Sequence, residues 1–164
     1  MLRCLLLLAG CAAAPHVGGT MDRVEPGSPP ETTMSNETPL VAVEAVRTTG
    51  DVGAYTVYVT LASVETGCDQ YADWWEVISH EGDLLYRRVL NHSHPDDQPF
   101  ERSGGPVNVA ADQRVIVRGH MNPQGYVGVA MEGTFGDGLR AATFPADFAA
   151  ELADVEPLPE SCLF

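Results

Sequence analysis

The stretch HSHPD, residues 92–96, holds the most concentrated set of potential metal ligands in the chain. Residues i and i+2 of an extended segment point to the same side, and the proline that follows the second histidine keeps that histidine extended. His92 and His94 could therefore present two imidazoles to one ion, with an oxygen ligand from Asp96. His120 is the best distant third imidazole. Because imidazole suits copper and zinc, a copper or zinc site is one hypothesis for this loop.

Two observations weaken the metal hypothesis. The His-x-His pattern fixes no third ligand, and His120 shares one face of its expected strand with Arg114 and Arg118, whose positive charges disfavour a bound cation. The simpler interpretation is that His92 and His94 face solvent or hold the loop by hydrogen bonds. On this interpretation the protein needs no cofactor.

The sequence contains no strong motif of catalysis. Gly-x-Ser-x-Gly, HExxH and phosphate-loop patterns are absent, and Ser103 begins a Ser-Gly-Gly-Pro run that favours a turn. We therefore expect no catalytic residues and no enzyme activity. A net charge of −14 also argues against nucleic acid as a partner. The remaining classes are a noncatalytic binding protein and a structural protein.

A second candidate site rests on aromatic residues. Tyr71, Trp74 and Trp75 lie in or beside one expected strand. Adjacent residues of a strand face opposite sides, so one tryptophan faces the core. The other is either covered by the C-terminal segment or partly exposed. An exposed tryptophan beside polar loops would suit a glycan or a peptide of an envelope protein.

The four cysteines divide by position. Cys4 and Cys11 lie in the first eleven residues, and Cys68 and Cys162 lie in the body of the chain. An even pair in an oxidising compartment predicts one disulfide between Cys68 and Cys162. That bond would tie the C-terminal tail to the folded domain.

The N-terminal residues MLRCLLLLAGCAAAP have the layout of a secretory signal. Within them, Leu8-Ala9-Gly10-Cys11 resembles the lipobox of bacterial lipoproteins. The resemblance implies cleavage before Cys11, acylation of that residue with palmitate among its chains, and anchoring to a membrane of the cell envelope. Ala12 in place of an aspartate implies the outer membrane. An ordinary secretory signal cut after Ala14 is the alternative.

Composition divides the chain into three parts. Residues 1–10 are the expected lipoprotein signal peptide, and residues 11–39 form a lipidated cysteine followed by a tether rich in proline, glycine, serine and threonine. Residues 40–164 form one domain, long enough to bury a core. Its apolar residues alternate in short runs separated by turns, which predicts an all-β fold. The expected strands are 40–47, 55–64, 73–79, 83–90, 114–120 and 126–135.

The Cys-Trp-Cys order resembles immunoglobulin-like and fibronectin-like domains, which implies a β-sandwich. Phe144, Phe148, Leu152 and Val155 recur at helical spacing, so we also expect one short C-terminal helix over residues 145–155. The segment from TGCDQYADWWEV to RSGGP is similar to an uncharacterised group of secreted bacterial proteins. That resemblance carries no function.

Overall fold

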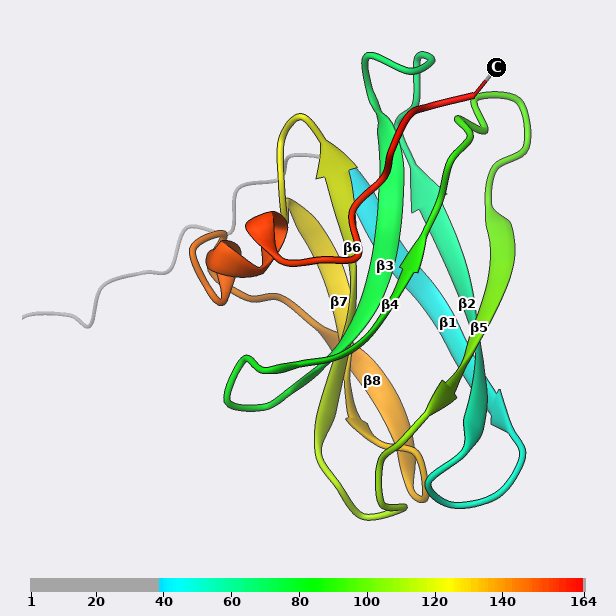
Figure 1. The fold of residues 1–164 in the computed structure, drawn as a ribbon, viewed down its shortest axis with the longest axis vertical. Coiled ribbons are helices and arrows are strands. Elements are labelled where there is room, and N and C mark those ends of the chain that lie inside the picture. The colour runs from blue at the N-terminus through cyan, green and yellow to red at the C-terminus, as the bar shows by residue number, and fades with distance from the viewer. Residues whose placement is uncertain (1–38, 164) are drawn as a thin grey trace, which may run out of the picture. The chain divides into compact units, whose positions relative to one another are not determined.

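The computed structural model describes residues 39–163, and they are almost entirely β-structure (Figure 1). The expected signal peptide, Cys11 and most of the tether lie outside the described residues. The elements are β1 (Val41–Thr49), β2 (Tyr55–Ser63), β3 (Tyr71–Ser79), β4 (Leu84–Val89), β5 (Phe100–Val107), β6 (Val115–Asn122), β7 (Gly128–Thr134), β8 (Gly138–Ala142) and the short 3-10 helix η1 (Ala150–Asp154). No helix among the described residues is long and apolar enough to span a membrane.

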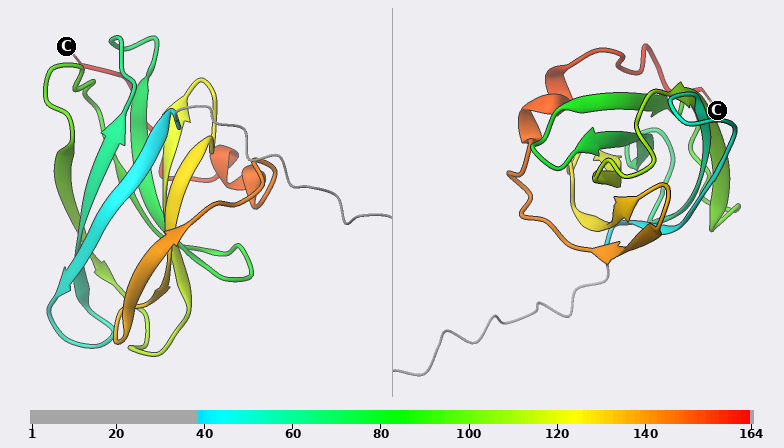
Figure 2. Two further views of the ribbon diagram at one scale, coloured as in Figure 1. Left: turned by 180° about the vertical axis from the view of Figure 1, so that it is seen from behind. Right: turned by 90° about the horizontal axis from the view of Figure 1, so that it is seen from below.

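The eight strands form one sheet in the order β4-β3-β6-β7-β1-β2-β5, with β8 paired to β7. Neighbours are antiparallel, apart from a short parallel pairing of Val41 and Ala42 with the start of β7. Viewed along the strands, the sheet curls until it is nearly closed into a barrel (Figure 2). The two end strands approach each other, since Arg88 Nε on β4 donates to the carbonyl of Ser103 on β5 at 3.1 Å. The all-β prediction is confirmed, whereas the immunoglobulin-like sandwich is not.

Apolar side chains at every second position of the strands fill the interior of this sheet. On β2, Tyr55, Val57, Val59 and Leu61 are buried in the core, as the period of two predicts. Each such side chain contributes about 1.5–3 kcal/mol through burial. Met121 belongs to the same core, because it lies on the face of β6 opposite Arg118 and His120.

All nine residues of β3 are buried, which means that its outer face is covered as well. Trp75 and Val77 face the interior, while Ile78 belongs to a second apolar cluster with Ile116. The cover is the C-terminal strap, residues 144–163, which crosses the outer face of β3 and β6 (Figure 1). Leu152 of the strap is buried in the second cluster.

The expected short C-terminal helix is present but shorter than predicted, and the expected turn at residues 103–106 is wrong. The strap contains a 3-10 helix of only five residues, not a helix over residues 145–155. Ala149 has a left-handed backbone that interrupts the expected helix, and Val155 is 40% exposed. Ser103-Gly-Gly-Pro106 is part of β5 and not a turn. A Cβ atom on Gly104 would lie 2.5 Å from Tyr86 Oη, so the glycine lets β5 pass close to β4.

Candidate functional site

A buried ion network lies on the outer face of the sheet. Glu76 on β3 is directly opposite Arg87 of β4 and Arg118 of β6 in the strand registers. Its side chain is fully buried, with Arg87 Nη2 at 2.6 Å from one carboxylate oxygen and Arg118 Nη2 at 2.8 Å from the other. Three charges at this depth are tolerated only when each is well paired. The network therefore fixes the positions of both guanidinium groups.

Both arginines also hold the C-terminal strap. Arg87 donates to the carbonyls of Leu152 at 2.7 Å and of Val155. Arg118 donates to the carbonyls of Phe148 at 2.6 Å and of Ala149 at 2.9 Å. Charged donors make the stronger protein hydrogen bonds. The strap is thus anchored through the side chains of two strands, in addition to its apolar contacts.

The histidine of β6 forms a second polar pair beside this network. His120 Nδ1 lies 2.6 Å from Asp73 Oδ1, and both residues are buried. The imidazole also stacks on Trp74, with ring centroids 3.7 Å apart and planes within 7°. Burial raises the pKa of Asp73, and the hydrogen bond with His120 opposes that shift. The carboxylate and the stacked indole hold the ring in one orientation.

A β-bulge explains why Asp73 reaches His120. In the pairing of β3 with β6, Ala72 is opposite Met121 and Trp74 is opposite His120, so Asp73 is the extra residue. An extra residue redirects the side chains that flank it. Ala72 belongs to the core, while Asp73 turns outward to the side that carries Trp74 and His120.

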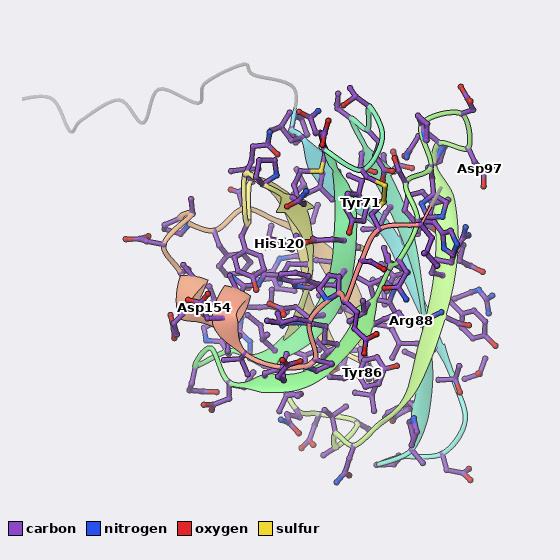
Figure 3. All side chains as sticks on the ribbon, turned by 45° about the horizontal axis from the view of Figure 1, so that its top comes forward. Tyr71, Tyr86, Arg88, Asp97, His120 and Asp154 are labelled. Atoms are coloured by element: carbon purple, nitrogen blue, oxygen red, sulfur yellow. A yellow bond between two sulfur atoms is a disulfide. The ribbon has the colours of Figure 1, made fainter. Side chains whose placement is uncertain are left out.

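A pocket of about 450 Å³ opens beside this pair. It lies between the start of β3, the end of β6 and the strap, and Figure 3 marks Tyr71 and His120 in this region. The polar residues of its lining are Tyr71, Asp73, His120, Asn122 and Ser161. The Cys68–Cys162 disulfide, with Cα atoms 5.6 Å apart, forms part of the wall. The predicted disulfide is therefore confirmed, and it joins the strap to the pocket.

The chemistry of the pocket follows from the Asp73–His120 pair. When a neutral imidazole donates its Nδ1 hydrogen to a carboxylate, the lone pair is on Nε2. Nε2 can then accept a hydrogen bond from a ligand. No arginine lines this pocket. In this tautomer the pocket offers an acceptor to a ligand that brings hydroxyl or N–H donors, and its lining includes the carboxylate of Asp73 but no arginine to pair with an anion.

The aromatic residues predicted to form a binding face occupy different positions. Trp75 is in the core, and Trp74 lies between the His120 ring and the guanidinium of Arg87, which is 4.4 Å from the indole centroid. Trp74 is 3% exposed, so it is covered and is not the exposed tryptophan that a binding face would need. Tyr71 and Trp74 both line the pocket. Asp73 and Glu76 were not predicted as site residues, although a carboxylate in an apolar strand followed by a strand with Arg87 and Arg88 is a pattern that could have indicated the ion pair.

The histidines of the HSHPD loop have other contacts. The His94 ring stacks on Phe100 at 4.1 Å, and its backbone N–H donates to the buried carboxylate of Glu65. Ser93 Oγ donates to the same carboxylate at 3.0 Å. Burial lowers the pKa of His94, and the charge of Arg102 lowers it further. Glu65 therefore anchors this loop, a role that the sequence does not reveal.

The candidate metal ligands are not assembled into a site in residues 39–163. No three histidine, cysteine, aspartate or glutamate side chains are arranged there to hold a metal ion. His120 lines the pocket beside the disulfide, whereas His92 and His94 line a separate pocket of about 400 Å³. Asp96 lines neither pocket. Metal binding by His92, His94, His120 and Asp96 stays a prediction that this geometry does not support.

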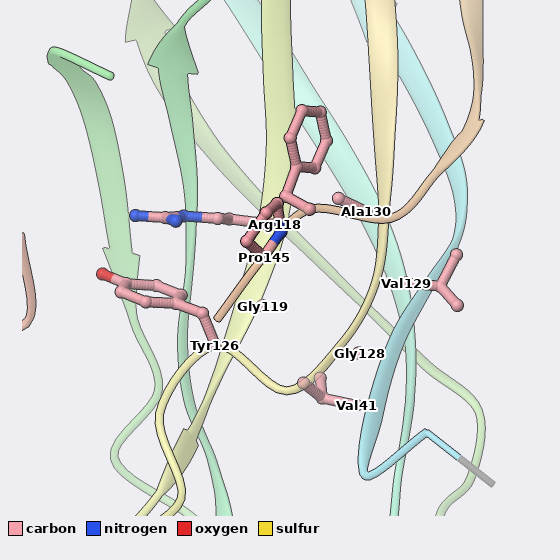
Figure 4. A pocket seen from close by; sticks show the side chains of 9 residues that line it. Val41, Arg118, Gly119, Tyr126, Gly128, Val129, Ala130 and Pro145 are labelled. Carbon is pink, nitrogen blue, oxygen red and sulfur yellow. The ribbon is translucent and has the colours of Figure 1, made fainter. Parts of the chain in front are cut away.

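A third pocket lies between the strap and the start of β7 (Figure 4). Arg118, Tyr126 and Gly128 contribute to its lining. Its volume is about 20 Å³, which is room for about one water molecule. It is therefore too small for a ligand.

Comparison with known proteins yields one informative relative. A protein named "Putative lipoprotein" from Halomicrobium mukohataei is 45% identical over 73 residues, which cover 44% of this chain. The matched region is 36% of that relative, so the chain spans well under half of its length. No family model and no solved structure matches the chain.

Proposed function

We propose that the protein is a lipid-anchored protein of the cell envelope whose β domain binds a small hydroxylated ligand without transforming it. Two facts support the anchor. Residues Leu8 to Cys11 resemble a lipobox, and the relative described above carries the name of a lipoprotein. Acyl chains contribute about 0.8 kcal/mol per buried methylene, so two or more hold a protein stably on a membrane.

The observation that carries the binding proposal is the Asp73–His120 pair at the wall of the 450 Å³ pocket. The pair supplies an oriented acceptor, while Tyr71, Asn122 and Ser161 supply groups that both donate and accept. Buried, oriented polar groups in a concave site are typical of ligand recognition. A neutral sugar or polyol can satisfy these groups. Because no arginine lines the pocket, a carboxylate or phosphate ligand would lack a charged partner there.

The same pair supports catalysis as the second candidate function. A histidine whose Nδ1 is held by a carboxylate is the proton acceptor of many hydrolases, and Ser161 lines the same pocket. Binding needs only the pocket and its polar groups, whereas catalysis also needs a bond of the ligand to be broken. The two candidates differ in one observable, because only catalysis converts the bound molecule.

The anchor is tested with the full chain in a host that processes lipoproteins. Cys11→Ser should move the protein from the membrane fraction to the soluble fraction, and Cys4→Ser, which changes a cysteine seven positions earlier, should not. Mass spectrometry of the N-terminal peptide should show acyl chains on Cys11. Membrane retention of Cys11→Ser equal to that of the parent chain would contradict the anchor.

The ligand class is tested with the soluble Cys11→Ser chain and a panel of neutral sugars, polyols, carboxylates and phosphates. We expect saturable changes in the amide NMR signals of residues 71–74 and 120–122 for a neutral member of the panel. Recovery of that compound unchanged after incubation supports binding, and its conversion supports the catalytic alternative. A panel in which only anions bind at these residues would contradict the proposal.

A further inference from the structure

The pocket beside the HSHPD loop has the opposite electrostatic character from the pocket beside the disulfide. Its volume is about 400 Å³, and its charged or protonatable lining residues are Arg88, Arg102, His92 and His94. No carboxylate lines it. This arrangement is unexpected in a chain with 23 acidic residues and nine basic ones.

The pairing of the arginines sets this pocket apart. The structure describes seven arginines, and five of them lie within ion-pair distance of a carboxylate. These pairs are Arg47 with Glu101, Arg87 and Arg118 with Glu76, and Arg114 and Arg140 with Glu132. Arg88 and Arg102 have no such partner among residues 39–163, and both line this one pocket.

Hydrogen bonds to the backbone hold the two guanidinium groups in place. Arg88 donates from Nε to the Ser103 carbonyl at 3.1 Å and from Nη1 to the Val89 carbonyl at 3.3 Å. Arg102 donates from Nη1 to the Glu101 carbonyl at 2.8 Å. A guanidinium has five N–H donors. Several donors on each arginine therefore remain for a ligand, on groups whose positions are already restricted.

The acidic residues of this region lie outside the lining of the pocket. The buried carboxylate of Glu65 lies 3.9 Å from His94 Nδ1 and accepts hydrogen bonds from Ser93 and from the His94 backbone, so its charge faces His94 and not the two arginines. Asp96 and Asp97 belong to the same loop but do not line the pocket. Arg88 and Arg102 bring two positive charges to one pocket without a carboxylate partner among residues 39–163, and like charges repel, so a bound anion would reduce that repulsion.

We propose that this pocket binds a tetrahedral oxyanion of the phosphate class, held by Arg88 and Arg102 with His92 at the rim. Planar guanidinium groups bind oxyanions through two parallel hydrogen bonds. On this proposal the HSHPD loop contributes to an anion site and not to the metal site that the sequence suggests. It is independent of the proposed function, because the two pockets share no lining residue.

The test uses the full chain with Cys11→Ser and inorganic phosphate as the probe, at an ionic strength kept constant with sodium chloride. We expect saturable changes in the NMR signals of residues 91–94 and of the Arg102 side chain, with a dissociation constant in the millimolar range or below. The double variant Arg88→Gln/Arg102→Gln should weaken phosphate binding by at least about tenfold.

The matched control is Arg47→Gln/Arg140→Gln, which removes the same charge from two exposed arginines outside the pocket. It should retain the affinity for phosphate to within about twofold. Equal weakening in both double variants, or no saturable change in the parent chain, would overturn the proposal. Arg88→Gln alone changes an exposed residue, so it provides the same comparison if the double variant does not fold.

Two further probes identify the source of the oxyanion. Vesicles that contain phosphatidic acid present a phosphate monoester at a membrane surface, and phosphatidylcholine vesicles do not. Binding of inorganic phosphate together with phosphatidic acid vesicles, lost in the pocket variant, supports a headgroup ligand. Binding of inorganic phosphate alone supports a free phosphate.

Discussion

Asp73 and His120 meet on the outer face of the sheet, with 2.6 Å between Asp73 Oδ1 and His120 Nδ1. The contact depends on the bulge that makes Asp73 the extra residue between Ala72 and Trp74. Without that bulge, Asp73 would point to the same side as Trp75, into the apolar core. The backbone irregularity is thus what creates the oriented imidazole of the candidate site.

Asp73→Asn tests the orientation of this imidazole. An asparagine can rotate its amide so that it donates to Nδ1, which moves the ring hydrogen to Nε2 and removes the acceptor. We expect the affinity for a neutral ligand of the pocket to fall by about tenfold or more. Asp112→Asn, in an exposed loop, is the control and should leave the affinity unchanged. An unaltered affinity in Asp73→Asn would show that the pair does not orient the acceptor.

Glu76→Gln tests the ion network that holds the strap. The change leaves Arg87 and Arg118 without their buried partner, and loss of one member of a buried ion pair costs about 3–5 kcal/mol. The matched variant Glu101→Gln breaks the exposed pair with Arg47, which should cost about 0–1 kcal/mol. Urea unfolding of both variants measures the difference. Similar losses of unfolding free energy would refute the structural role of the network.

Removal of the disulfide tests the attachment of the strap. Cys68→Ser/Cys162→Ser should lower the free energy of unfolding by about 2–4 kcal/mol. Since Cys162 lies at the wall of the ligand pocket, amide exchange should also accelerate in residues 156–163. The buried network should keep residues 148–152 protected. Loss of protection across the whole strap would show that the disulfide, and not Glu76, is its main anchor.

The environment of His94 makes stability depend on pH. Its pKa is lowered in the folded protein by burial first and by the charge of Arg102 second. Below its ordinary value of 6.5 the unfolded chain therefore binds more protons at this site than the folded chain does. Stability contributed by neutral His94 is fully present above pH 6.5 and is lost as pH falls through the folded pKa.

Comparison of two histidine variants isolates this effect. In urea unfolding between pH 7.5 and about 4.5, His94→Gln should flatten the loss of stability toward acid. His80→Gln, which alters an exposed turn histidine, should not. The same slope in His94→Gln and in the parent chain would mean that other groups cause the pH dependence.

The sequence predicts the parts of the fold that follow local periodicity. The alternation in β2 identifies its buried face, and the adjacent tryptophans of β3 do divide between the core and the covered outer face. The expectation of an oxidising compartment, together with two cysteines in the body of the chain, predicts the Cys68–Cys162 bond that the structure contains. These features depend on side-chain polarity and spacing, which the chain displays directly.

The missed features depend on distant segments. The two glycines of β5 favour a turn by propensity, yet this segment pairs with β2 and passes close to Tyr86. The predicted helix is reduced to five residues of 3-10 helix, since Ala149 has a left-handed backbone, and Arg87 and Arg118 bind carbonyls of the strap on either side of this break. Asp73 was missed because a bulge reverses the side expected from alternation. Tertiary contacts decide all three.

The most direct test of the ligand site uses His120→Asn in the neutral ligand panel. Asparagine can reproduce the Nδ1–H donor to Asp73, but it has no atom at the position of Nε2. We predict that the NMR changes in residues 71–74 and 120–122 disappear while the chain stays folded and the Cys68–Cys162 bond remains. Ligand binding by His120→Asn with the affinity of the parent chain would contradict the assignment of this pocket.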